Sequence, residues 1–171
     1  NIGIIGYGRI GQAVVDRLIP FKANILISDP FCTSPINKSN SSLVDISYLL
    51  KNSDIISLHC PSTEKTKNII NKQSLSLMKK GVSIINLGRG DLIDMDSLIN
   101  YLNNKTINYV ALDVFDIEPL VETHPIRYFD NVLLSSHVAS ASIKAVQKLR
   151  QSAAELIIKC HNNEKLKNIV N

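Results

Sequence analysis

The sequence predicts an α/β fold built on a doubly wound parallel sheet, and three observations support this prediction. Short, nearly continuous apolar runs alternate with segments of helical apolar spacing, which is typical of parallel strands covered on both faces. The first run ends in a glycine-rich turn that opens a helical segment, and polar or ionisable residues follow the later runs. Ligands of open parallel sheets bind outside the carboxyl ends of the strands, so these residues mark the expected site.

The predicted elements alternate along most of the chain. Six apolar runs predict strands, at residues 2–5, 23–28, 54–58, 82–86, 107–112 and 131–134. Apolar residues at helical spacing predict helices, at residues 10–18, 43–50, 71–78, 94–102 and 140–161. Ser41 or Ser42, Asn71 and Asp94 stand where N-caps are expected. Pro61 forces the chain out of the sheet after the third strand.

Composition limits the class of protein. The chain has 171 residues, 44% of them hydrophobic and 20% charged, which suits one globular domain with a sizeable core over residues 1–171. The formal net charge is +4, but the lysines are scattered or lie near the end of the chain, which favours a solvated basic face over a nucleic-acid surface. Three widely spaced cysteines indicate no disulfide framework, and neither a signal peptide nor a run of 18 apolar residues is recognised. We therefore expect a cytoplasmic protein without nucleic-acid or membrane partners.

The first strand ends in Gly6-Tyr7-Gly8-Arg9-Ile10-Gly11. In a strand-turn-helix with this spacing, the first glycine makes a tight turn and the second lets backbone approach a phosphate. The third glycine lets the helix lie close to the strand, and N–H groups at the helix N-terminus bind pyrophosphate. The motif alone is a weak signal, because short glycine patterns also occur in ordinary loops.

Asp29 strengthens this interpretation. It follows the glycine motif at the spacing of about 20 residues that dinucleotide-binding domains show, at the end of the second predicted strand. A carboxylate there accepts hydrogen bonds from the adenosine ribose and repels a 2′-phosphate. Asp29-Pro30 is also an ordinary turn opener, but the complete strand-turn-helix-strand-Asp unit favours a Rossmann-like domain that binds NAD rather than NADP.

Four stretches resemble the NAD-binding domain of the D-isomer-specific 2-hydroxyacid dehydrogenases. They are Gly6 to Gly11 with Asp29, Asn86 to Asp94 leading to Leu98, Ala111 to Phe115 with Glu118-Pro119, and Asn131 to His137. The resemblance covers nearly the whole chain, and residues 166–171 are similar to the family's segment that returns to the substrate domain. It implies an NAD-dependent oxidoreductase that interconverts 2-keto acids and D-2-hydroxy acids, and a homodimer.

The resemblance implies catalytic roles for three residues. Arg89 would hold the substrate carboxylate through a planar fork of donors. His137 would give a proton to the developing alkoxide during reduction, and Glu118 would pair with it and favour the imidazolium. Taken singly, they are equally well explained as a solvated loop charge, a structural histidine and a turn residue. Their joint placement after predicted strands favours catalysis.

The resemblance also implies a set of cofactor contacts. They are Gly6, Gly8, Gly11 and the backbone of Arg9 and Ile10 at the pyrophosphate, Asp29 at the ribose, Cys60, Pro61 and Thr66 on the adenosine side, Leu87 and Gly88 under the nicotinamide ribose, and Asp113 at the carboxamide. His59 and Cys60 have no further ligand at suitable spacing, so we expect no metal. Ser135-Ser136-His137 has no G-x-S-x-G elbow, so we expect no hydrolase.

Two departures from the family and one alternative function stay open. Ser136 stands where the family often has Pro, and residues 139–142 stand where it has glycines, which leaves the local loop shape and the substrate preference open. The chain begins without Met, directly in its first predicted strand, so we expect the family's N-terminal substrate-domain segment to be missing. The alternative is a non-catalytic NAD(H)-sensing regulator similar to the corepressors of this fold, a branch that residues 140–155 also resemble.

Overall fold

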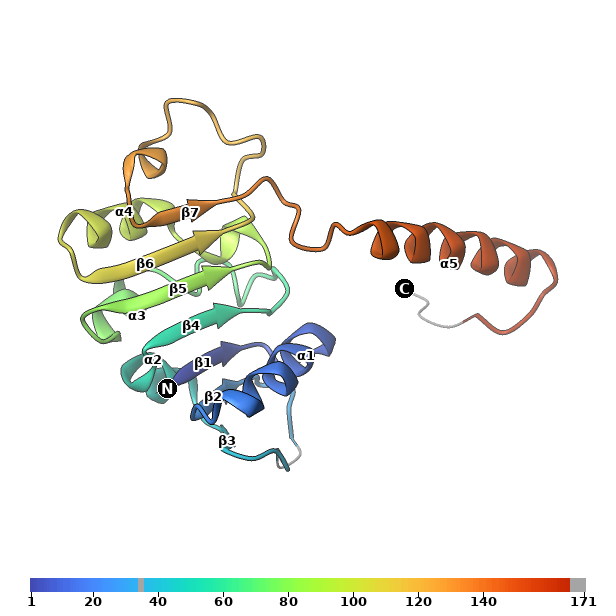
Figure 1. Cartoon of the computed structure of the whole chain (residues 1–171), viewed down its shortest axis with the longest axis horizontal. Coiled ribbons are helices and arrows are strands. Elements are labelled where there is room, and N and C mark those ends of the chain that lie inside the picture. The colour runs from blue at the N-terminus through green and yellow to red at the C-terminus, as the bar shows by residue number, and fades with distance from the viewer. Residues whose placement is uncertain (34–35, 167–171) are drawn as a thin grey trace. The chain divides into compact units, whose positions relative to one another are not determined.

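The computed structural model describes residues 1–33 and 36–166, and the strands of these residues form one parallel sheet. The strand order is β3-β2-β1-β4-β5-β6-β7 (Figure 1). The bounds are β1 Ile2–Ile5, β2 Ile25–Ser28, β3 Ser41–Leu43, β4 Ile55–Leu58, β5 Val82–Asn86, β6 Ile107–Leu112 and β7 Val132–Leu134. This confirms the predicted fold class, an α/β doubly wound parallel sheet.

The strand order reverses at β1. The chain runs from β1 outward to β2 and β3, then returns past β1 to β4 and continues through β5 and β6 to β7. At such a switch point the loops after neighbouring strands leave in opposite directions and open a crevice at the carboxyl edge of the sheet. The glycine-rich turn after β1 and the loop after β4 therefore border this crevice.

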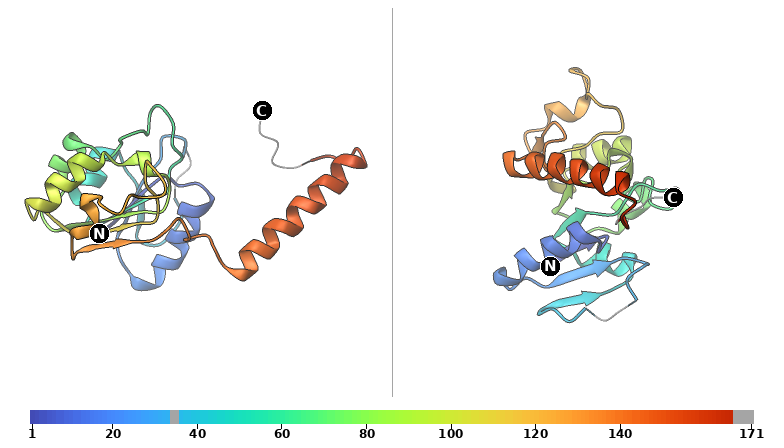
Figure 2. Two further views of the ribbon diagram at one scale, coloured as in Figure 1. Left: turned by 90° about the horizontal axis from the view of Figure 1, so that it is seen from above. Right: turned by 90° about the vertical axis from the view of Figure 1, so that its right-hand side faces the viewer.

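Helices cover the two faces unequally. Their bounds are α1 Arg9–Leu18, α2 Ile46–Asn52, α3 Lys72–Leu77 and α4 Met95–Asn103, with 3-10 turns η1 Ile19–Phe21, η2 Gly90–Leu92 and η3 Pro125–Tyr128. In Figure 2, α1 lies on one face and α2, α3 and α4 lie on the other. Val15 of α1 packs with Ile4 in a small core, whereas Leu49 of α2 and Leu98 of α4 belong to the larger core.

Within residues 1–137 helices lie on both faces of the sheet, as the sequence predicted, and α1 lies on its face close to β1. The parallel register aligns Ile4, Ser57, Ile85, Ala111 and Leu133 in one row across β1, β4, β5, β6 and β7. Ile4, in this row, is fully buried and packs with Val15 of α1. Val15 also packs with Ile25 and Ile27 of β2, so α1 covers β1 and β2.

Residues 41–50 fold differently from the predicted helix. Ser41 and Ser42 are not N-caps, because they belong to the edge strand β3, which pairs with β2. Asp45 caps α2 instead, and its Oδ1 accepts a hydrogen bond from Tyr48 N at 2.8 Å. Leu43 matches helical spacing, but pairing with β2 satisfies the backbone of its segment, and a local apolar pattern does not report a distant strand.

The predicted N-caps of α3 and α4 are confirmed. Asn71 Oδ1 accepts hydrogen bonds from Gln73 N and Ser74 N, and Asn71 N donates to Ser74 Oγ at 2.7 Å. Asp94 occupies the N-cap position of α4, although its Oδ2 accepts from the Ser97 hydroxyl at 2.5 Å rather than from a backbone N–H. Both helices therefore begin where the sequence predicted.

The chain divides into two compact units, residues 1–137 and residues 138–171. The first unit contains the sheet and α1 to α4. In the second, α5 Ile143–His161 is capped by Ser142, whose Oγ accepts a hydrogen bond from Ala145 N at 3.1 Å. The predicted return segment after Leu166 lies outside the described residues. That residues 1–171 form one dinucleotide-binding domain stays a prediction.

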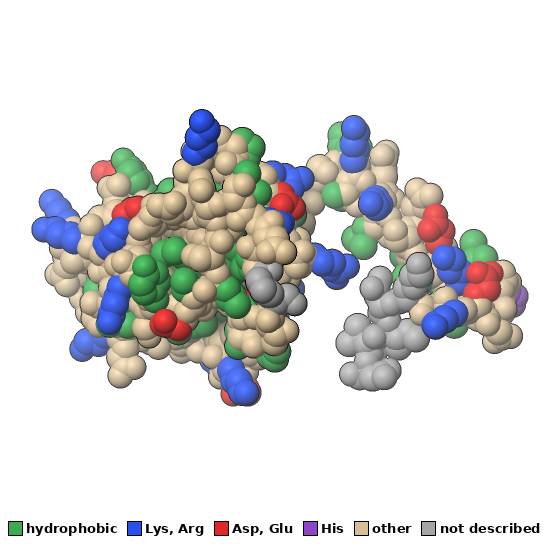
Figure 3. Space-filling model, turned by 90° about the horizontal axis from the view of Figure 1, so that it is seen from below, with side chains coloured by type: hydrophobic (Ala, Val, Ile, Leu, Met, Phe, Trp, Pro, Cys, Tyr) green, Lys and Arg blue, Asp and Glu red, His purple; other side chains and the backbone are tan. Residues whose placement is uncertain are grey.

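Surface charge and the cysteines complete the description. The Lys and Arg side chains on the face shown in Figure 3 are dispersed among acidic and uncharged ones. Cys32, Cys60 and Cys160, which all lie within the described residues, form no disulfide. In the described part of the chain, no helix combines the length and the apolar character needed to cross a membrane.

Candidate active site

The glycine-rich turn requires glycine at two positions for steric reasons. Gly6 has a φ of +93°, and a Cβ there would lie 2.5 Å from Cys60 N. A Cβ at Gly11 would lie 2.1 Å from Gly6 O, so α1 lies this close to the turn because residue 11 has no side chain. At Gly8, the N-cap of α1, a Cβ would meet nothing within 4 Å. The open space at this helix N-terminus fits the pyrophosphate of a dinucleotide.

Arg9 and Ile10 belong to the end of this turn, and Asp29 lies beside it. Arg9 and Ile10 form the exposed first turn of α1, where backbone N–H groups have no carbonyl partner within the helix. Asp29 lies directly after β2, and its Oδ2 accepts a hydrogen bond from Tyr7 N at 2.7 Å. Its Oδ1 accepts from Phe31 N at 2.9 Å. The two bonds fix the carboxylate beside the turn, where the sequence predicted the ribose site.

The loop after β4 is braced by its own side chains. Thr66 Oγ1 donates to Pro61 O at 2.6 Å and accepts from Thr63 N at 2.8 Å. Cys60 is buried with its backbone against Gly6, and this burial raises the pKa of the Cys60 thiol to about 11. Cys60, Pro61 and Thr66, the residues predicted on the adenosine side, therefore belong to one constrained loop next to the glycine-rich turn.

The turn after β5 carries Leu87, Gly88 and Arg89, and Asn86 organises it. The buried Asn86 side chain accepts a hydrogen bond from Gly88 N at 3.0 Å and donates to Arg89 O at 2.8 Å. Leu87 is exposed, and Arg89 Nη1 donates back to Gly88 O at 2.7 Å. The backbone of this turn is therefore fixed, whereas the exposed guanidinium contacts its own loop.

Asp113 connects the ends of β5, β6 and β7. It is 1% exposed, and Ser135 Oγ donates to its Oδ1 at 2.5 Å. Asp113 N donates to Asn86 O at 3.1 Å, and Asp113 O accepts from His137 N at 2.8 Å. The predicted carboxamide partner is therefore held rigidly, and Ser135, which the sequence analysis did not single out, holds its carboxylate.

His137 and Glu118 form a close pair. His137 Nδ1 lies 2.9 Å from Glu118 Oε2, and Phe115 N donates to Glu118 Oε1 at 2.9 Å. The hydrogen bond from His137, followed by that from Phe115, holds the pKa of the Glu118 carboxyl below its usual value. The carboxylate therefore stays ionised near neutral pH, and the Nε2 atom of the ring faces away from it.

The backbone of His137 is strained. Its φ is +56°, a left-handed conformation that is uncommon for residues other than glycine. Such conformations cost on the order of 1–3 kcal/mol and persist where surrounding contacts hold them, often at functional sites. Here the backbone bond to Asp113 O and the side-chain bond to Glu118 hold the residue.

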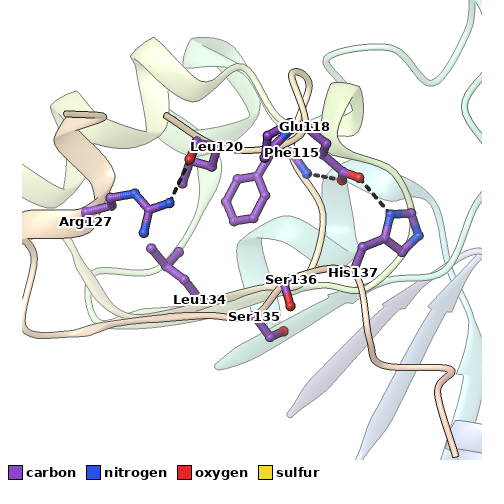
Figure 4. A pocket seen from close by; sticks show the side chains of 9 residues that line it. Phe115, Glu118, Leu120, Arg127, Leu134, Ser135, Ser136 and His137 are labelled. Atoms are coloured by element: carbon purple, nitrogen blue, oxygen red, sulfur yellow. Dashed lines mark hydrogen bonds and ion pairs between the residues drawn. The ribbon is translucent and has the colours of Figure 1, made fainter. Parts of the chain in front are cut away.

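The His137–Glu118 pair lines a cavity of about 570 Å³. Figure 4 shows the pair at one end of this cavity and Arg127 at the other. Phe115, Leu120 and Leu134 supply apolar walls between them. The Glu118 and His137 side chains are 36% and 48% exposed, so water reaches the pair in this chain.

The structure brings two of the three predicted catalytic residues together. Glu118 and His137 are in contact, but Arg89 is not among the residues that line the cavity. Arg127 lines it instead, and the sequence analysis missed this residue because a single arginine in a polar segment forms no motif. The neighbouring His124-Pro125 was a weak signal of a turn that would fix it.

A phosphate-binding turn at the switch point of a parallel sheet defines a dinucleotide-binding domain. An acid–base pair at the same sheet edge is what an oxidoreductase acting on a hydroxyl or carbonyl group requires. Comparison with known proteins then identifies the family within this class. The chain belongs to the D-isomer specific 2-hydroxyacid dehydrogenase family, whose NAD binding domain matches residues 1–139.

Individual relatives agree with this family. The chain is 41% identical to a glyoxylate reductase of Thermofilum pendens over 92% of this chain and 47% of the relative. It is 40% identical to a D-3-phosphoglycerate dehydrogenase of Methanocaldococcus jannaschii over 100% of this chain and 33% of the relative. The crystal structure of D-lactate dehydrogenase with NAD+ from Lactobacillus jensenii matches with a TM-score of 0.90 and 28% identity over 99% of this chain and 55% of that one. The chain thus spans about half or less of the length of these relatives.

Proposed function

We propose that the whole protein is an NAD-dependent dehydrogenase that interconverts 2-keto acids and D-2-hydroxy acids. The observation that carries this proposal is the 2.9 Å contact between Glu118 Oε2 and His137 Nδ1 at the carboxyl edge of the sheet. It provides a proton donor and acceptor beside the predicted dinucleotide site. When bound, NAD would supply or accept the hydride.

The cofactor site is proposed to use mainly backbone. The N–H groups of Arg9 and Ile10 would bind the pyrophosphate in the space beside Gly8, and Asp29 would accept hydrogen bonds from the ribose. The Asp113 carboxylate would accept from the carboxamide and so select the ring face that meets the substrate. Steric demand at Gly11 and the open space at Gly8 support this arrangement.

The proton transfer is proposed to depend on the His137–Glu118 pair. During reduction, His137 Nε2 would donate a proton to the carbonyl oxygen as it becomes an alkoxide, and during oxidation it would take that proton back. The Glu118 carboxylate would orient the ring through Nδ1 and favour its protonated form. The ionised state of Glu118, implied by its lowered pKa, supports this role.

Arg89 is proposed to orient the substrate carboxylate. Its guanidinium is exposed, so exchanging the bond to Gly88 O for a carboxylate requires no unfolding. We expect Arg89→Lys in the whole protein to retain NADH affinity and lose most turnover, because an ammonium keeps the charge without the planar fork. NADH fluorescence titration together with steady-state kinetics measures both quantities.

Preference for NAD over NADP follows from Asp29. Its fixed carboxylate would repel a 2′-phosphate. We therefore expect Asp29→Ala to weaken NADH binding and to reduce the preference for NADH over NADPH. Tighter binding of NADPH than of NADH by the unmodified protein would contradict this assignment.

The proposal also covers assembly and location. Homodimerisation is proposed from the family resemblance, and a strictly monomeric whole protein in sedimentation at micromolar concentration would contradict it. A cytoplasmic location is supported by cysteines that form no disulfide, and dispersed basic side chains favour a solvated surface.

Turnover of the whole protein with glyoxylate, pyruvate and hydroxypyruvate tests the function directly. We expect NADH oxidation with at least one 2-keto acid. NADH binding without turnover across a broad panel would favour the alternative, a non-catalytic NAD(H)-sensing regulator. The relatives named above are dehydrogenases and reductases, which supports the proposed enzymatic function over the regulator.

A further inference from the structure

We infer that Arg127 is a positioning residue, which acts by holding the loop of Glu118 so that the carboxylate meets His137. This inference rests on the proposed function for its kinetic consequence. Arg127 Nη2 donates to Leu120 O at 2.7 Å, and Arg127 Nε donates to Val121 O at 2.9 Å. One guanidinium thus binds two successive carbonyls directly after Glu118-Pro119, and Figure 4 shows the bond to Leu120.

Arg127 is itself mounted on a fixed support. It lies in η3, whose Ile126 is fully buried in the larger core. The His124 ring caps this turn, because its Nδ1 accepts a hydrogen bond from Ile126 N at 3.2 Å. Arg127 N also donates to His124 O at 3.0 Å. The larger core therefore fixes the position of the guanidinium, and the guanidinium in turn holds the two carbonyls that it binds.

The loop needs such a hold at the end that carries Glu118. At its start, Phe115 is pressed against Gly90, where an added Cβ would lie 1.9 Å from the Phe115 carbonyl carbon. Beyond Phe115, residues 116–119 are exposed and belong to no helix or strand. Glu118 is hydrogen-bonded to Phe115 N and His137, two contacts that water can replace because the side chain is 36% exposed. The Arg127 fork restricts the next two residues and so keeps Glu118 within reach of His137.

For holding the loop, the planar shape of the Arg127 guanidinium matters more than its positive charge. Two donors in a fixed fork match two adjacent carbonyls, whereas a lysine ammonium is a single flexible point donor. A positioning role and a charge role for Arg127 therefore predict different behaviour of the Arg127→Lys variant. If Arg127 held the loop, lysine would resemble alanine; if it supplied only positive charge to the cavity, lysine would resemble arginine.

The test compares Arg127→Ala, Arg127→Lys and Arg17→Ala in the whole protein. Arg17 is a matched control, because its exposed guanidinium also donates to a backbone carbonyl, Ala13 O at 2.7 Å, but within α1. We expect both Arg127 variants to bind NADH normally and to lose about tenfold in kcat. We expect the alkaline limb of their reduction profile to move to lower pH, in the same direction as in Glu118→Gln, because the carboxylate is withdrawn from His137. Arg17→Ala should change neither quantity.

Two further measurements make the result decisive. In a Glu118→Gln background, Arg127→Ala should cause no additional shift of the profile, because the effect passes through Glu118. Amide exchange at Phe115, whose N–H bonds to Glu118, should accelerate at least fivefold in both Arg127 variants, and it is measured whether or not the protein turns over. A kinetic profile that Arg127→Lys leaves unchanged, an added shift in the Gln background, or unchanged Phe115 exchange would each overturn the inference. Absence of turnover in the unmodified protein would instead reject the proposed function, and the exchange result would still decide whether Arg127 holds Glu118.

Discussion

Two regions at the carboxyl edge of the sheet are built in different ways. The cofactor half, residues 6–11 with Asp29 and the loop 59–66, consists of tightly packed backbone in which a Cβ at Gly11 would lie 2.1 Å from Gly6 O. The reaction half, residues 115–137, places its chemistry on Glu118 and His137, whose side chains are 36% and 48% exposed. Under the proposed function, cofactor binding therefore relies on packed backbone, whereas proton transfer relies on side chains that a loop must hold in place.

The sharpest contrast is expected between this chain alone and the whole protein. The residues proposed for the cofactor half all lie within the 171 residues, so the chain alone should bind NADH. Water reaches the His137–Glu118 pair, so turnover with glyoxylate, pyruvate or hydroxypyruvate should be at least about 10⁴-fold slower, since positioning and exclusion of water contribute about 7–11 kcal/mol. Fluorescence titration and NADH oxidation measure the two halves separately. Turnover equal to that of the whole protein would show that the reaction half is already complete.

His137→Asn should break the reaction half and spare the cofactor half. Asn keeps a polar side chain but cannot deliver a proton near neutral pH, so turnover of the whole protein should fall by about 10²–10⁴-fold. NADH affinity should stay within about twofold, because the backbone contacts of the cofactor half are untouched. A comparable loss of NADH affinity would mean that the two halves are not separable.

Substitution of the turn glycines should break the cofactor half. Gly11→Ala forces a Cβ against Gly6 O and should lower both the melting temperature and NADH affinity, the latter by more than about tenfold, or about 1.4 kcal/mol. Gly8→Ala is the matched variant, because its Cβ meets nothing within 4 Å. It should keep the melting temperature and weaken NADH binding alone. Equal thermal destabilisation by both substitutions, measured by calorimetry, would contradict the steric argument.

Glu118→Gln should shift the reaction half without abolishing it. The hydrogen bond from His137 lowers the pKa of Glu118, so the carboxylate is ionised across the neutral range and stabilises a protonated partner. Gln removes the carboxylate that pairs with His137, so the alkaline limb of the reduction profile should move to lower pH. A profile that does not move would remove Glu118 from the mechanism.

Thiol labelling gives the smallest effect and reports only on packing. Burial raises the pKa of Cys60 to about 11, so at pH 8 it is a protonated, inaccessible thiol. Cys160 is exposed on α5. Iodoacetamide followed by mass spectrometry should therefore modify Cys160 and leave Cys60 intact in the folded protein. Rapid modification of Cys60 would show that the cofactor half opens readily.

The same contrast explains which features were predictable. The glycine-rich turn and Asp29 are read from local spacing, because the tight turn and the helix N-terminus involve residues near each other in the chain. Glu118 and His137 were identified through family resemblance, and their contact required the loop to bring together residues that are distant in sequence. The short edge strand β3 was mistaken for the start of a helix because its pairing with β2 leaves no local trace.

The sequence by itself determined the parallel sheet, the glycine turn after β1 and the caps of α3 and α4, because apolar period, glycine and capping residues act over a few neighbours. Only the tertiary structure decided that β3 pairs with β2, that Arg89 lies outside the cavity and that Arg127 binds the carbonyls of Leu120 and Val121. These properties depend on which segment pairs with the edge of the sheet and on where a loop returns. No local pattern encodes these properties, since they are set by packing between elements far apart in the chain.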